Sequence, residues 1–215
     1  MRARVKDPLK YSLLGTLVLE ASSCKYLGII LRNDLSWADH VNYMVKKAWK
    51  ALHFIMRILR KGNSNTKRLA YTSLVWPILE YGAVCWDPYR EGQIRELDRV
   101  QKKAVKFSHH TKSPTWETLA WCRKTAHLCA LYKAYGGEMA WKAIGDRLEW
   151  PHYLSRADHN LKIRNRRQRT DIRKYSFVNR TIEHWNQLPA KVLEPLPCNS
   201  TTFRIRIRKV ISEVR

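Results

Sequence analysis

The sequence predicts a mainly α-helical fold in which an N-terminal β-hairpin precedes a helical bundle and further C-terminal helices. Apolar residues recur at intervals of three and four over most of residues 36–135, as they do on one face of a helix. Residues 9–31 instead contain two short apolar runs without that period. Hydrophobic residues make up 45% of the chain and nine residues are tryptophan, which indicates a packed core rather than a disordered chain.

The predicted strands occupy the two apolar runs. Residues 11–19 are rich in Leu, Val and Thr, residues 21–23 interrupt the pattern, and residues 25–31 form the second run. We expect the two runs to pair with each other as one hairpin. Because a two-stranded hairpin is marginally stable alone, it should need a neighbouring sheet or helix.

The first predicted helix begins at Ser36 and ends near Gly62. Ser36 and Asp39 have the spacing of a capping box, with Asp in place of the usual Glu, and Gly62 stands where a helix C-cap belongs. Its apolar face consists of Trp37, Val41, Val45, Ala48, Leu52, Ile55 and Leu59.

Two more helical patterns follow. Residues 66–84 have a helical period that Pro77 should kink or split. After a turn at residues 86–88, a third helix is predicted over residues 93–107. Its inward face consists of Ile94, Leu97, Val100, Gln101, Ala104 and Val105.

The rest of the chain is predicted to alternate between helix and irregular structure. Ser113 and Pro114 should begin a helix, since proline is favoured in a first turn, and the pattern of residues 119–135 continues it until Gly136 and Gly137. Residues 162–174 carry seven basic residues against one acid, which is typical of a linker or mobile arm.

Order should return at residues 177–192. Residues 203–214 fit either a strand or a helix, because both periods are present. Their length, and Ser200 as a possible cap, favour a helix.

The strongest bulk property is positive charge. Lys and Arg total 41 against 18 Asp and Glu, a net charge of +23. Such an excess attracts polyanions, and binding to them should weaken steeply with salt. The alternative explanation of this positive charge is that it keeps the protein soluble or faces an acidic protein partner.

The cysteines and the apolar segments bear on location. The five cysteines are widely spaced and include no Cys-x-x-Cys, so a disulfide framework is not expected and a reducing compartment fits better. The start of the chain only loosely resembles a signal peptide, and no stretch is apolar enough to span a membrane. We expect an intracellular protein, nuclear or cytoplasmic, without a membrane partner.

Two predicted helices each carry a stripe of basic residues opposite the apolar face. The first ridge consists of Lys46, Lys50, His53, Arg57 and Lys61. The second ridge consists of Arg95, Arg99, Lys102 and Lys106. Surface helices usually have a charged outer face, but that face usually mixes signs. We expect both ridges to contact phosphate backbones, without reading base sequence.

No catalytic constellation is present in the sequence. There is no adjacent Asp-Asp, phosphate-binding loop, Gly-x-Ser-x-Gly or His-Glu-x-x-His motif. Cys122, His127 and Cys129 do not converge on one helix face and lack a fourth ligand, so core cysteines and a surface histidine are favoured over zinc. We expect no metal, no cofactor and no enzymatic activity of this chain on its own.

Three stretches, taken in order, resemble one family. The first combines residues 25–29 and 35–37 with His40. The second includes Tyr71, Leu74, Pro77, Leu79, Glu80, Tyr81, Trp86, Asp87 and Pro88 and continues to residues 100–104. The third comprises residues 176–177, 180–182 and 185–189. Together they resemble the C-terminal part of the reverse transcriptase, an RNA-directed DNA polymerase, encoded by LINE-type non-LTR retrotransposons.

The resemblance implies a division of the chain. Residues 1–34 would be a palm-edge hairpin remnant, 35–149 a helical thumb-like domain, 150–175 a basic linker and 176–215 a C-terminal helical segment. The palm, with its metal-binding aspartates, and the endonuclease domain would lie outside this chain.

The resemblance also implies roles for particular residues. Tyr26, Leu27 and Gly28 would lie at the primer-grip position, and the first ridge would face a template–primer duplex of RNA or DNA. The family often has an Arg pair where this chain has Cys122-Arg123-Lys124, which leaves the surface role of that segment open. Residues 185–189 are expected to be a packing motif.

Three hypotheses follow for the function. The chain would be a reverse-transcriptase fragment that binds nucleic acid without polymerising, a repurposed protein-interaction module, or the non-functional product of a decayed element. The oligomeric state and the preference between RNA and DNA stay open.

Overall fold

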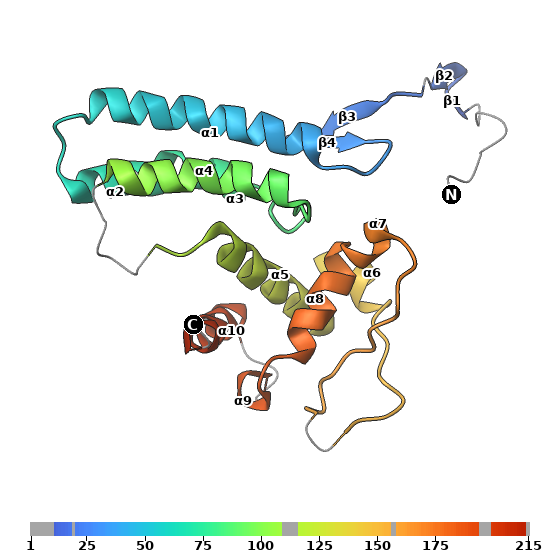
Figure 1. Ribbon diagram of the computed structural model, residues 1–215. Helices are drawn as coiled ribbons and strands as arrows, with labels where there is room; N and C mark the ends of the chain where they lie inside the picture. Colours follow the sequence, from blue (N-terminus) through green and yellow to red (C-terminus); the bar gives the residue numbers. More distant parts are fainter. Residues whose placement is uncertain (1–10, 19, 109–115, 156–157, 194–198, 214–215) are drawn as a thin grey trace.

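The computed structural model describes residues 11–18, 20–108, 116–155, 158–193 and 199–213. Helices dominate these residues, and antiparallel strand pairs precede them, which confirms the predicted fold class. A layer that contains the longest helix lies above a second group of helices (Figure 1).

The strands form two small hairpins rather than one. Strands β1 (Tyr11–Leu13) and β2 (Thr16–Val18) pair antiparallel, and so do β3 (Ser23–Tyr26) and β4 (Ile29–Arg32). The expectation that the two apolar runs pair with each other was wrong, because each run folds back on itself. Both turns are Leu-Gly pairs with positive φ at both residues, the geometry of a two-residue hairpin: Leu14 (49°), Gly15 (79°), Leu27 (45°) and Gly28 (81°).

The second hairpin adjoins the first long helix, α1 (Ala38–Ile58). The Ile30 amide donates to Nδ1 of His40 at 3.3 Å, and Arg32 donates to Asp39 at 2.7 Å. Asp39 is therefore engaged by the hairpin and not by a capping box. The N-cap residue of α1 is Trp37, whose side chain makes no capping hydrogen bond, and Ser36 Oγ only accepts from the Ala38 amide at 3.4 Å, so the capping-box prediction was wrong.

The upper layer is completed by α2 (Ser64–Leu74), α3 (Trp76–Glu80) and α4 (Glu91–Phe107). Helix α1 ends at Ile58 with Leu59 as its C-cap, and the Gly62 amide donates to the Leu59 carbonyl at 3.0 Å in the turn beyond, so Gly62 is not the C-cap. Pro77 lies in the first turn of α3, and the predicted split of residues 66–84 is confirmed.

The first hydrophobic core lies between these helices. The apolar face predicted for α1 points into it, as do Leu97, Val100 and Ala104 of the face predicted for α4, whereas Ile94 and Val105 of that face are only half-buried. Its buried residues include Val41, Met44, Ala48, Leu52, Ile55, Tyr71, Val75, Leu79, Trp86, Leu97, Val100, Ala104 and Leu119.

Helix α5 (Leu119–Tyr135) ends where predicted but begins later than the predicted helix, and it is capped by Thr118, whose Oγ1 accepts from the Trp121 amide at 3.2 Å. Residues 116–118 are not helical, so α5 does not continue a helix from further upstream. The start predicted at Ser113 and Pro114 lies outside the described residues. Gly136 is the C-cap, as expected.

Shorter elements and two further helices surround α5. They are the 3-10 turn η1 (Met139–Trp141), α6 (Lys142–Gly145), α7 (Asp171–Lys174), α8 (Phe177–Asn186), α9 (Ala190–Leu193) and α10 (Ser200–Glu213). Helix α10 confirms the helical reading of the tail. Asn199 rather than Ser200 provides the cap, because its Oδ1 accepts from the Thr201 amide at 3.0 Å.

A second hydrophobic core gathers α5 and α8 to α10. Its buried residues are Leu128, Leu131, Tyr132, Ile163, Ile182, Trp185, Leu188, Val192, Leu193, Phe203 and Ile207. Since Leu119 belongs to the first core and Leu128 to the second, the division between the cores falls within α5.

The basic segment is irregular over most of its length, as expected of a linker, but it is anchored to the second core. Ile163 is buried, and the Asn186 side chain pairs with its backbone amide and carbonyl at 2.9 and 2.7 Å. Trp185 donates to the Leu161 carbonyl at 2.8 Å. Trp185 and Leu188 are buried, in line with a packing motif at residues 185–189, whereas Pro189 is exposed.

Candidate nucleic-acid interface

The first ridge lies on the solvent face of α1. Lys46, Lys50, His53 and Arg57 belong to the helix, Lys61 follows its end, and all five side chains are exposed. The residues that α1 buries lie on the opposite face, because the two sets differ by about half a turn. The sequence therefore predicted the direction of this ridge correctly.

The first ridge carries positive charge that no acid balances. Among the described residues, Lys46, Lys50, Arg57 and Lys61 form no ion pair. The only acid on α1 is Asp39, which Arg32 already binds. From Lys46 to Arg57 the helix rises about 16 Å, which is the axial length of about five steps along a nucleic-acid strand.

Lys25 extends this ridge toward the second hairpin. Its Nζ lies 3.1 Å from the Tyr43 hydroxyl and 4.5 Å from the ring centroid. The hydrogen bond with Lys25 lowers the pKa of Tyr43. Tyr43 precedes Lys46 by three and Lys50 by seven residues, so it shares their helix face. Sequence reasoning missed Lys25, because the contact depends on how the hairpin docks.

An exposed aromatic ring lies beside the first ridge. Phe54 is 50% exposed, and the Arg57 guanidinium lies 6.0 Å from its ring centroid. Sequence reasoning also missed Phe54, although its position off the apolar face of α1 was a usable signal. Exposed aromatic rings next to cations offer stacking surfaces for unpaired bases.

The second ridge differs from its prediction. Arg95, Arg99, Lys102 and Lys106 are all exposed on α4, but two of them are paired: Arg95 binds Glu91 at 2.6 Å and Arg99 binds Glu96 at 2.7 Å. The expectation of a nearly single-signed face was wrong for this helix, since the acids one turn away compensate half of it.

The two ridges also do not form one surface. Helices α1 and α4 pack against each other through their apolar faces. Because each ridge lies opposite its apolar face, the ridges point to different sides of the layer. We therefore take the first ridge, with Lys25, as the candidate interface.

The residues expected at the primer-grip position form the turn of the β3–β4 hairpin. Tyr26 and Leu27 are 66% and 72% exposed. The Tyr81 hydroxyl donates to the Leu27 carbonyl at 2.8 Å, and a Cβ on Gly28 would meet the Tyr81 ring at 3.2 Å. Tyr81, which follows α3, thus holds the turn in place by this hydrogen bond. The turn lies near the N-terminal end of α1, where Lys25 extends the first ridge.

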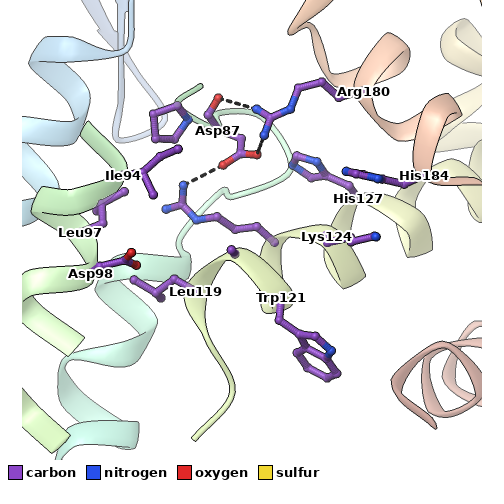
Figure 2. A pocket seen from close by; sticks show the side chains of 13 residues that line it. Asp87, Ile94, Leu97, Asp98, Leu119, Trp121, Lys124, His127, Arg180 and His184 are labelled. Carbon is purple, nitrogen blue, oxygen red and sulfur yellow. Dashed lines mark hydrogen bonds and ion pairs between the residues drawn. The ribbon is translucent and has the colours of Figure 1, made fainter. Parts of the chain in front are cut away.

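The segment around Arg123 is internal. Arg123 is buried and donates to Asp87 at 3.0 Å, an interaction that Figure 2 marks with a dashed line from the Asp87 carboxylate. It also donates to the Leu79 carbonyl at 3.0 Å and lies over the Trp86 ring at 4.2 Å. Arg180 from α8 binds the other Asp87 oxygen at 2.9 Å. The two arginines thus connect the upper layer, through Asp87, to α5 and α8. This arrangement does not support a surface role for Arg123.

The candidate zinc group is also internal. His127 is buried, with Nε2 2.9 Å from the Ala83 carbonyl, so the expectation of a surface histidine was wrong. Burial raises the pKa of the Cys122 and Cys129 thiols. Within the part of the chain that the structure describes, no cluster of His, Cys, Asp or Glu could hold a metal ion, and Cys24, Cys85, Cys122 and Cys129 are free thiols.

Of the helices in the described ranges, none is both long and apolar enough to cross a membrane. The chain matched no protein-family model, no curated protein and no solved structure in the comparisons.

Proposed function

We propose that this chain binds nucleic acid by its phosphate backbone along α1, as the thumb-like region of a LINE-type reverse transcriptase would hold a template–primer duplex. The observation that carries the proposal is the first ridge, which presents exposed cations along α1 that form no ion pair with any acid in the described part of the chain. A helix face fixes the spacing of its charges, so a line of phosphates can be followed without large rearrangement.

The surroundings of the first ridge support the same function. Lys25 continues the positive surface toward the Tyr26 turn, which is where the resemblance expects contact with a primer. Phe54 adds a ring for stacking. Cations spaced along one helix face match the spacing of phosphates and a ring can stack on any base, so we expect binding to depend little on sequence.

The test neutralises the first ridge and measures affinity. We expect Lys46→Gln, Lys50→Gln and Arg57→Gln together to weaken binding of a short labelled RNA–DNA duplex by about tenfold or more, because counterion release is lost. The slope of log affinity against log salt should fall by about three, one for each phosphate contact removed. Fluorescence anisotropy over a salt series measures both quantities.

A matched control removes the same charge elsewhere. Lys142, Arg147 and Lys191 are exposed and form no ion pair within the described ranges, so their replacement by Gln leaves net charge equal to that of the ridge variant. If both triple variants lose affinity equally, the charge acts diffusely and the first ridge is not the interface. Nucleotide incorporation on a primed template by this chain alone would contradict the non-catalytic part of the proposal.

A further inference from the structure

Residues 164–174, here called the basic strap, are attached to structured parts of the molecule at both ends. At the start, the Arg164 amide donates to the Glu149 carbonyl at 2.7 Å. The strap leads from the second group of helices to α7, next to the upper layer (Figure 1). Directly after α7, the Tyr175 ring stacks on Tyr89, with centroids 4.3 Å apart and planes at 4°. The strap is therefore a placed surface of the fold.

The basic strap keeps most of its positive charge unpaired. Glu149 forms ion pairs with Arg164, at 3.4 Å, and with Arg166. The one acid within the strap is Asp171, in the first turn of α7. The remaining basic side chains of the strap are exposed and form no ion pair with any acid in the described ranges: Arg167, Arg169, Arg173 and Lys174. Arginine guanidinium groups bind phosphate with two parallel hydrogen bonds, so this surface fits a polyanion built of phosphates.

Aromatic rings lie at the α7 end of the strap, and cations accompany them. Lys174 Nζ lies 5.2 Å from the Tyr175 ring centroid, and the Arg90 guanidinium lies 5.9 Å from that of Tyr89. Both rings line a cavity of about 260 Å³ between the upper layer and α8. An unpaired base is smaller than the drug-sized ligands whose pockets start at roughly 300 Å³. Other apolar residues that line the cavity are Leu35, Trp37, Val84, Ile172 and Phe177.

We propose that the basic strap and this cavity form a second nucleic-acid surface, which binds single strands. The phosphates follow the strap, and one base enters the cavity against Tyr89 and Tyr175. The bases of a duplex are paired and stacked on one another, whereas unpaired bases are free to contact aromatic side chains. An acidic protein would match the charge of the strap but has no need of the aromatic cavity. The inference goes beyond duplex binding by α1 and does not depend on it.

The first experiment removes the charge of the strap in the background of the ridge variant, so that α1 does not contribute. We expect Arg167→Gln, Arg169→Gln and Arg173→Gln together to weaken binding of a labelled oligothymidylate by about tenfold or more. The slope of log affinity against log salt should fall by about two, because each single-strand phosphate contributes about 0.7. Fluorescence anisotropy measures both quantities.

The same strap substitutions in a chain with an intact first ridge should leave duplex affinity nearly unchanged. The matched control again replaces Lys142, Arg147 and Lys191 by Gln, now in the ridge-variant background. The proposal is overturned if the strap substitutions weaken oligothymidylate binding no more than this control does. A failure of α1 to bind duplex would leave the single-strand result as it stands, so the two proposals fail separately.

The second experiment tests the contact with a base. Tyr175→Ala should weaken oligothymidylate binding at least about fivefold, and Tyr175→Phe should preserve it, because stacking needs the ring and not the hydroxyl. Tyr153→Ala, at an exposed tyrosine outside the cavity, is the matched control. An abasic strand of equal length should bind wild type more weakly than oligothymidylate. Equal binding of the two strands would assign the strap to polyanions in general, acidic proteins included, and would overturn the proposal.

A chemical readout locates the bound strand. Cys85 lines the cavity and Cys24 lies on β3, outside it, and both are exposed free thiols. Saturating oligothymidylate should slow alkylation of Cys85 by iodoacetamide and leave Cys24 as reactive as before, which peptide mass spectrometry resolves. Equal effects on the two thiols, with the strand bound, would place the base elsewhere and contradict the assignment of the cavity.

Discussion

Asp87 joins parts of the chain that are distant in sequence. Its two carboxylate oxygens accept from Arg123 on α5 and from Arg180 on α8, and its own carbonyl accepts from Arg180 at 3.2 Å. The side chains of Asp87 and Arg123 are 14% and 5% exposed. At this burial, loss of the acid would leave an arginine charge without compensation, which costs far more than the intact pair contributes.

We therefore expect Asp87→Ala to lower the free energy of unfolding by about 3 kcal/mol or more. Glu91→Ala is the control, because Glu91 pairs with Arg95 on the surface of α4, where such a pair contributes less than about 1 kcal/mol. Urea unfolding followed by circular dichroism measures both. Equal losses of stability in the two variants would show that Asp87 is not a buried clamp. In the Asp87→Ala background, Arg123→Met should recover part of the lost stability, because it removes the uncompensated charge.

Among the elements, the two hairpins have the same turn but different surroundings. Gly28 has φ +81° and contacts the Tyr81 ring, whereas Gly15 has φ +79° and nothing within 4 Å. The β3–β4 hairpin is bonded to α1 through Ile30 and Arg32. The β1–β2 hairpin extends away from the helices (Figure 1), with the described side chains of β1 exposed.

The two glycines provide a matched pair of substitutions. Gly28→Ala should lower the free energy of unfolding by about 1–2 kcal/mol, because alanine is strained in the left-handed region and its methyl group would press on Tyr81. Gly15→Ala has the same backbone cost but should leave global unfolding almost unchanged, since its hairpin opens locally. Guanidinium unfolding monitored on the helical signal compares them. An equal effect of both changes would contradict the docking of the second hairpin.

Helices were predictable where the spacing of apolar residues fits a helix and no other element. The end of α5, the apolar face of α1 and most of the apolar face of α4 follow from local spacing. The pairing of strands did not follow, because Leu-Gly lacks the Asn or Asp that usually marks a two-residue turn. The ion pairs of Arg95 with Glu91 and of Arg99 with Glu96 also follow from local spacing, because each pair is one helical turn apart.

The candidate site was predictable only in part. The direction of the first ridge depends on α1 alone, so periodicity was sufficient. The Lys25 contact, the Asp87 clamp and the burial of His127 depend on packing between segments that are 18 to 93 residues apart. No local pattern carries that information.

At the scale of the whole molecule, the two cores meet at a junction that is rich in histidine and arginine side chains. His40 lies edge-on to Trp86, with ring centroids 4.5 Å apart, and Arg123 covers the same indole. His127 and His184 lie on the α5 and α8 side of the Asp87 clamp (Figure 2). A chain with net charge +23 gains further positive charge at this junction when its histidines are protonated.

Acid should therefore weaken the junction. Burial, with a contribution from Arg123, lowers the pKa of His40 to about 4, and burial also lowers the pKa of His127 and His184. Because the unfolded chain takes up protons near pH 6.5 and the folded chain does not, the free energy of unfolding should fall as pH decreases from 7 to 5, before most carboxylates titrate. His40→Asn keeps an acceptor for the Ile30 amide but cannot be protonated in this range, so its stability should depend less on pH. His53→Asn, a change at the exposed surface of α1, should retain the full slope. Urea unfolding at several pH values measures the slopes, and identical slopes for wild type and His40→Asn would exclude His40 as a source of acid sensitivity.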